Sequence, residues 1–111
     1  MSVRRPLVDA TRATADGAVE GDLVAVLWRQ VRDVRSRTGL EVRLQLGPRV
    51  PATAAPGMIE RLTRAVEKAV ADARLRGATS LEVEIRAGID CVALAVSDDR
   101  GGLLLTAAAL R

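Results

Sequence analysis

The chain has 111 residues, a hydrophobic content of 49% and a formal net charge of +3, which is enough apolar material for one compact domain. Histidine and asparagine are absent and cysteine occurs once. This excludes a structural zinc site, a Ser-His-Asp triad, a Cys-His nucleophile and a phospho-acceptor histidine. No run approaches the ~20 apolar residues of a membrane span, and no apolar segment follows the N-terminal arginines, so we predict a cytoplasmic protein without a secretion signal.

The first half of the chain predicts an arm, a helix and a strand. Residues 1–19 are polar and weakly patterned, and we expect an N-terminal arm that precedes a domain over residues 20–111. After Asp22, a candidate N-cap, apolar residues recur at three-four spacing and predict a helix that ends near Thr38-Gly39. Leu40–Leu46 alternates apolar and polar residues, as a half-buried strand does. A proline-containing loop follows, up to Gly57.

The longest predicted helix spans Met58–Arg76 and ends at Gly77. Its apolar residues line one face, and its charged residues form i,i+4 pairs that support it, namely Glu60 with Arg64 and Lys68 with Asp72.

Two strands and a tail complete the chain. Leu81–Ile85 alternates, Cys91–Val96 is almost continuously apolar, and a turn at Gly88 joins them into a predicted hairpin. The apolar, alanine-rich tail Leu103–Leu110 predicts a short helix or an edge segment. This order of elements predicts an α+β fold, a two-layer sandwich of helices on a small mixed or antiparallel sheet.

Three segments together resemble a known family. They are Arg37-Thr38-Gly39-Leu40-Glu41-Val42-Arg43-Leu44 before the long helix, Glu67 with Ala78-Thr79 on and after it, and Val96-Ser97-Asp98-Asp99-Arg100-Gly101-Gly102 after the hairpin. In order and spacing, residues 20–103 resemble the ATP-binding domain of sensor histidine kinases, a branch of the superfamily of gyrase-type ATPases and Hsp90. The resemblance implies a partial fold of this type, also called the Bergerat or GHKL fold.

The helix motif of the family, E-A-x-x-N-A-x-x-H-x-x-A-T, is damaged in this chain. Ala71 stands where the asparagine of the family coordinates Mg²⁺, and a methyl group offers no oxygen to a hard cation. Leu75 occupies the histidine position. Glu67 matches the general base of the hydrolysing relatives, but without a metal site we expect a surface carboxylate beside Arg64 and Lys68.

The glycine motif is damaged as well. Asp98 matches the carboxylate that accepts a hydrogen bond from the adenine amino group, and Gly102 retains the second glycine. Arg100 stands where a glycine of the family lets the backbone approach the base. No segment after Gly102 resembles the second glycine-rich box that holds the phosphates. The resemblance therefore implies a degenerate nucleotide site made of Asp98, Gly102, Glu67, Ala71 and Arg100, with no catalytic residue, no metal ligand and no bound cofactor expected.

We predict a non-catalytic signalling or regulatory module that acts through protein contacts. A response regulator, a sigma factor, a kinase half or a second copy would be its partner, and Leu103–Leu110 with the sheet edge would be its contact surface. One alternative is weak binding of ATP or ADP, with Asp98 on the base and Arg64 or Arg100 on the phosphates.

A further alternative is a nucleic-acid-binding regulator that uses four arginines of the first helix, although a solvated helix face explains them more simply. These are Arg29, Arg32, Arg35 and Arg37. A folded remnant without activity is the last.

Overall fold

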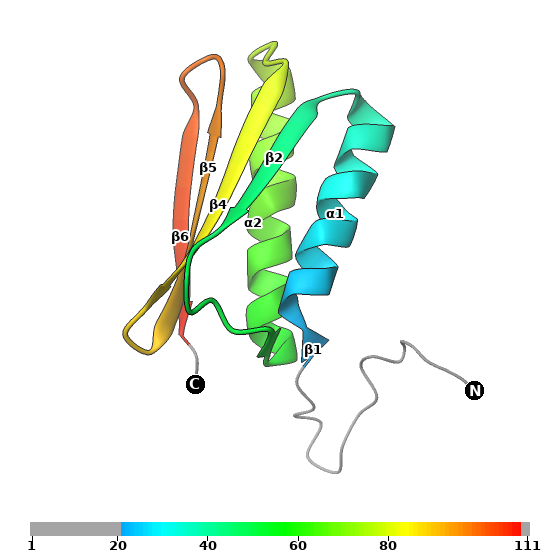
Figure 1. Cartoon of the computed structure of the whole chain (residues 1–111). Coiled ribbons are helices and arrows are strands. Elements are labelled where there is room, and N and C mark those ends of the chain that lie inside the picture. The colour runs from blue at the N-terminus through cyan, green and yellow to red at the C-terminus, as the bar shows by residue number, and fades with distance from the viewer. Residues whose placement is uncertain (1–20, 110–111) are drawn as a thin grey trace, which may run out of the picture.

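The computed structural model describes residues 21–109 (Figure 1); the predicted arm, residues 1–19, lies outside this range. Within it the chain forms two helices and six strands, in the order β1 (Gly21–Asp22), α1 (Leu23–Thr38), β2 (Glu41–Leu46), β3 (Thr53–Ala54), α2 (Pro56–Leu75), β4 (Ser80–Gly88), β5 (Cys91–Asp98) and β6 (Leu103–Ala109). The α+β class is confirmed.

The main sheet has the strand order β2-β4-β5-β6. β2 runs parallel to β4, with Glu41 opposite Ser80, whereas β4, β5 and β6 form an antiparallel meander. Both helices cover one face of this sheet, α1 over β2 and α2 over β5 and β6 (Figure 1). The result is the predicted two-layer sandwich, and neither helix of the described range lies on the opposite face of the sheet.

The ends of α1 follow the predicted capping residues. Asp22 accepts a hydrogen bond from the backbone N–H of Ala25 at 2.9 Å, as an N-cap does. Gly39 ends the helix in the left-handed region, with φ +75°, and its N–H donates to the carbonyl of Arg35. A positive φ at this position is why glycine stands there.

α2 begins at Pro56, two residues earlier than predicted, because proline has its φ already fixed for the first helical turn. The predicted loop before it also contains the short strand β3, which pairs with β1. The two predicted ion pairs are confirmed: Arg64 lies 2.6 Å from Glu60, and the Lys68 ammonium lies 3.4 Å from Asp72.

The alanine-rich tail is a strand and not a helix. β6 pairs with β5 from Leu103 to Ala109 and lies at the edge of the sheet, so the edge prediction is confirmed and the helix alternative is wrong. Pairing with β5 and packing against α2 outweigh the helix propensity of alanine. The hairpin turn lies at Ile89 and Asp90, directly after Gly88, and Asp90 has φ +58°.

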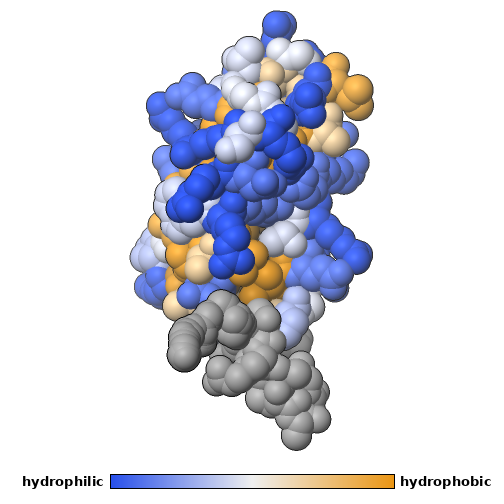
Figure 2. Space-filling view, turned by 90° about the vertical axis from the view of Figure 1, so that its right-hand side faces the viewer, coloured by the Kyte–Doolittle hydropathy of each residue, from blue (hydrophilic) through white to orange (hydrophobic). Residues whose placement is uncertain are grey.

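The core lies between the helices and the sheet and is entirely aliphatic. Its largest fully buried side chains come from both layers: Leu23, Leu27, Val31 and Val34 from α1, Leu62 and Val66 from α2, and Val42, Val83, Ile85, Val92, Leu94 and Val96 from the sheet. The outer side of the helices is mostly hydrophilic (Figure 2). Neither helix of the described range has the length and apolar character needed to cross a membrane.

Candidate functional site

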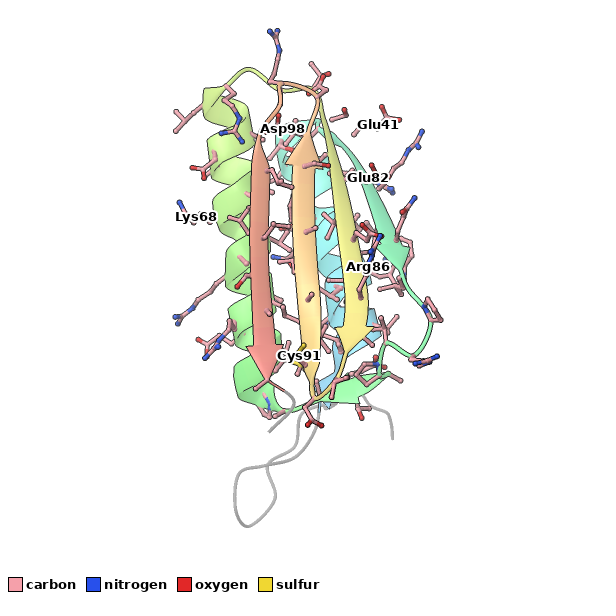
Figure 3. The ribbon with its side chains drawn as sticks, turned by 90° about the vertical axis from the view of Figure 1, so that its left-hand side faces the viewer. Glu41, Lys68, Glu82, Arg86, Cys91 and Asp98 are labelled. Carbon is pink, nitrogen blue, oxygen red and sulfur yellow. The ribbon has the colours of Figure 1, made fainter. Side chains whose placement is uncertain are left out.

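The segment that resembles the glycine motif joins β5 to β6 at one end of the sheet (Figure 3). The C-terminal end of α2 and the start of β4 lie beside it, because Arg76 and Thr79 both bond to its acidic residues. Three parts of the chain that are distant in sequence thus meet around Asp98 and Asp99.

The carboxylate of Asp98 is fully engaged by the chain itself. Its Oδ2 accepts two hydrogen bonds from the guanidinium of Arg76, at 3.0 and 2.6 Å. Its Oδ1 accepts from the backbone N–H groups of Arg100 and Gly102, at 2.7 and 3.0 Å. A carboxylate has about four lone-pair sites, so these contacts leave none for an adenine amino group.

The surroundings of Asp98 agree with this internal role. Its side chain is only 2% exposed. The bonds from Arg76 first, and then from the Gly102 and Arg100 backbone, hold the pKa of the Asp98 carboxyl below its usual value of 3.8. Asp98 is therefore a charged group that closes the turn.

Packing within the chain, without any nucleotide, explains why residue 102 is a glycine. A Cβ at this position would overlap the guanidinium of Arg76 and the carboxylate of Asp98. The retained second glycine therefore makes room for the Arg76–Asp98 ion pair. Arg100, the other residue of the motif, contributes its backbone N–H to Asp98 while its side chain is exposed.

Sequence reasoning missed the role of Asp99. Its carboxylate accepts hydrogen bonds from the Thr79 hydroxyl at 2.6 Å, the Thr79 N–H at 2.9 Å and the Ser80 N–H at 3.2 Å. These bonds lower the pKa of Asp99 from 3.8 to about 2, the Thr79 hydroxyl contributing most. The signal in the sequence was Thr79, whose short hydroxyl side chain stands directly before the strand that pairs with β5.

Glu67 lies between the two helices, where its carboxylate accepts hydrogen bonds from Arg37 of α1 at 3.0 and 2.9 Å. Gln30 of α1 donates to it at 3.2 Å. Hydrogen bonds from Arg37 to Asp33 and Glu67 raise the pKa of Arg37 above its usual range. Glu67 is an exposed carboxylate, as expected, but the neighbouring Arg64 and Lys68 pair with Glu60 and Asp72.

The two remaining positions of the helix motif have apolar side chains, which offer no oxygen or nitrogen to a metal ion or a nucleotide. Ala71 is exposed on α2, and Leu75, at the histidine position, is 86% exposed. The structure therefore brings Asp98, Arg100 and Gly102 together in one loop. Glu67 is bound to α1, on a different side of α2 from the residues near that loop.

A cavity of about 220 Å³ lies between α2 and the sheet beside Asp98. Its lining comprises Lys68, Ala69, Asp72, Arg76, Leu81, Val96, Asp98, Leu103 and Leu104, a set that includes neither Glu67 nor Ala71. Ligand pockets usually have volumes of about 300 to 1,000 Å³. This cavity is therefore small for a nucleotide, and the side chain of Arg76 contributes to its wall.

The arginines of α1 do not act as one cluster. Arg35 donates to the carbonyl of Val42 at 3.0 Å, and Arg37 bonds to Asp33 and Glu67. Arg29 and Arg32 are exposed. Two of the four arginines thus stabilise the fold.

Comparison with known proteins adds no relative: no family model matches the chain, and no curated protein matches it either. Within residues 21–109, no group of three or more His, Cys, Asp and Glu side chains is arranged to hold a metal ion.

Proposed function

We propose that this protein is a non-catalytic signalling or regulatory module, on a scaffold similar to the ATP-binding domain of sensor histidine kinases, and that it acts in the cytoplasm through protein contacts. The observation that carries the proposal is the state of Asp98. The one carboxylate available to recognise adenine is saturated by Arg76 and by two backbone N–H groups.

Three further observations support the absence of catalysis. Ala71 provides no oxygen for Mg²⁺, and Glu67, which would activate water in a hydrolase, is held by Arg37 and Gln30 between the helices. The cavity next to Asp98 is smaller than an ordinary ligand pocket. The core and the loop therefore remain, whereas position 71 lacks the oxygen that would hold a metal and the carboxylate of Glu67 serves contacts with α1.

Isothermal titration of the full chain with ATP and with ADP, with and without Mg²⁺, tests this proposal. We expect no binding in the micromolar range. The variant Ala71→Asn restores the missing amide oxygen but leaves Asp98 saturated, so it should not bind either. The exposed substitution Ala52→Asn is the matched control.

Micromolar, Mg²⁺-dependent binding by the unchanged chain would overturn the proposal. If Asp98→Asn then abolished that binding while the circular dichroism spectrum stayed the same, weak nucleotide binding through Asp98 would replace it.

A further inference from the structure

The face of the sheet opposite the helices is divided into two unlike halves (Figure 3). On β5 and β6 the side chains of this face are apolar or small: Cys91, Ala93, Ala95, Ser97, Leu103, Leu105, Ala107 and Ala109. Leu103 and Leu105 are 64% and 69% exposed. Solvent-facing positions of an antiparallel sheet are ordinarily polar, so this half resembles a surface that another protein covers.

The other half, on β2 and β4, carries charges of both signs. Glu82, Glu84 and Arg86 follow one another along the open face, and Arg86 lies 2.8 Å from Glu84. Between this row and the apolar half lies a shallow depression, lined by residues that include Arg86, Ala95 and Leu105. A partner of this face must therefore present an apolar stripe. Beside it, the partner must present charges that complement the β4 side chains, which are negative at one end of the strand and positive at the other.

Pairing of two β6 edges would not cover the apolar half. β6 contains no charged residue and no proline, the usual protections of an edge strand. Antiparallel addition of a second β6 would satisfy its free backbone groups. However, it would place Leu103 and Leu105 of both copies side by side on the same open face and enlarge the exposed patch. Only a layer stacked on the face removes these side chains from water.

We propose that the open face binds a second copy of this chain, sheet on sheet, about a two-fold axis that crosses the strands at Glu84, Ala95 and Leu105. These three residues lie opposite one another on β4, β5 and β6. Each strand then lies against its own copy in the reverse direction, within the roughly 30° of aligned sheets. The inference rests on the proposed function, because it names the partner of a module that acts by protein contact.

The charges of β4 are complementary under this axis. Arg86 comes opposite the second copy's Glu82, since both lie two residues from Glu84 along β4. Glu84 meets its own counterpart near the axis, but each is already paired with its own Arg86. An arginine has five N–H donors, so Arg86 can hold Glu84 and the second copy's Glu82 together.

The apolar half is complementary in size. Leu103 comes opposite the second copy's Ala107, because each lies two residues from Leu105 along β6. Ala93 comes opposite Ser97 in the same way along β5. A large side chain therefore meets a small one on β6, which is the condition for two layers to interdigitate.

The area of the face favours this axis over one that runs along the strands at the apolar half. Strands lie about 4.8 Å apart and rise about 3.3 Å per residue, so the face of the four-stranded sheet measures roughly 19 by 23 Å, or about 440 Å² in projection. Stable interfaces bury about 800 Å² of accessible surface per partner. An axis along the strands at the apolar half would overlap only that half, whereas the crossing axis uses the entire face. Even so, the interface is small compared with those of stable dimers, and the dimer should dissociate on dilution.

Analytical ultracentrifugation of the full chain over a wide range of concentration tests the proposal. We expect a monomer–dimer equilibrium. Ala95→Glu, at the centre of the face, should raise the dissociation constant at least about 100-fold, since it buries a charge. Ala52→Glu, the same change at an exposed position away from the sheet, should leave the dissociation constant unchanged.

A charge exchange tests the arrangement with side chains that are on the surface and should not disturb folding. Arg86→Glu alone and Glu82→Arg alone should each weaken the dimer about tenfold, because each sets like charges opposite one another. The double variant should recover the affinity of the unchanged chain. A monomer at every concentration, a dimer indifferent to Ala95→Glu, or a double variant no better than the single ones would overturn the proposal. None of these results depends on nucleotide, so they are separable from the titration with ATP.

Discussion

The two faces of the sheet differ in polarity on β4 but are both apolar on β5 and β6. On β4, buried and exposed residues alternate regularly, and the helix side and the open side differ in character at every step. On β5 and β6, the residues of the open side are nearly as apolar as those under α2. A strand that is apolar on both sides is typical of a strand buried on both sides. The open side of β5 and β6 therefore has the composition of an interior surface, although no other element of residues 21–109 covers it.

The sharpest test of this difference uses two leucines on neighbouring strands. Leu94→Ala should lower the free energy of unfolding by about 2 to 5 kcal/mol, because Leu94 is 1% exposed and its removal leaves a cavity under the helices. Leu105→Ala should change it by less than about 0.5 kcal/mol in the dissociated chain. Urea denaturation at low protein concentration measures both, and equal losses would contradict the distinction between the faces.

A smaller contrast is expected on β4, where alternation is regular. Ile85→Val removes one methylene group from a fully buried position and should cost about 0.5 to 1.5 kcal/mol. Its neighbour Arg86 has a side chain that is 72% exposed, and Arg86→Ala should stay within about 0.5 kcal/mol of the unchanged chain. A larger loss for Arg86→Ala than for Ile85→Val, measured as above, would show that the open face of β4 contributes to the fold itself.

The smallest effect should come from the loop end of the sheet, which polar contacts hold. Asp98 and Asp99 have lowered pKa values in the folded chain, about 2 for Asp99, against the usual 3.8. Between these values the unfolded chain binds more protons, so stability is full above about pH 4 and falls as the pH decreases towards 2. Denaturation midpoints across this range should show a weaker pH dependence in Asp99→Asn.

Ile85→Val provides the control for the pH experiment, because a lost methylene group should lower the midpoint equally at every pH. An Asp99→Asn variant with the pH dependence of the unchanged chain would contradict the assignment of Asp99 as the clamp of the loop.

Local patterns in the sequence predicted most of the fold. Alternation located β2 and β4, three-four spacing located both helices, and Asp22 and Gly39 marked the ends of α1. The tail could not be assigned to one structure, because an apolar, alanine-rich segment suits a helix as well as a strand. Its structure depends on β5, which offers an unpaired edge, and that information is not local.

The candidate site was less predictable for a related reason. Residue identities showed that Ala71 lacks an oxygen, since this needs no knowledge of neighbours. They did not show that Asp98 is saturated, because Arg76 is distant in sequence and reaches Asp98 only after α2 has packed on the sheet. The same holds for Glu67, whose partners come from α1.

The parallel pairing of β2 with β4 has a consequence for the order in which the chain folds. The meander β4-β5-β6 needs only short loops, whereas the pairing of Glu41 with Ser80 must close a loop that contains the whole of α2. Loop closure costs entropy before the contact is gained, and contacts of long sequence separation slow folding. We therefore expect the meander to form early and β2 to join late, together with α1, so that the free edge of β4 remains accessible to other chains until the last step is complete.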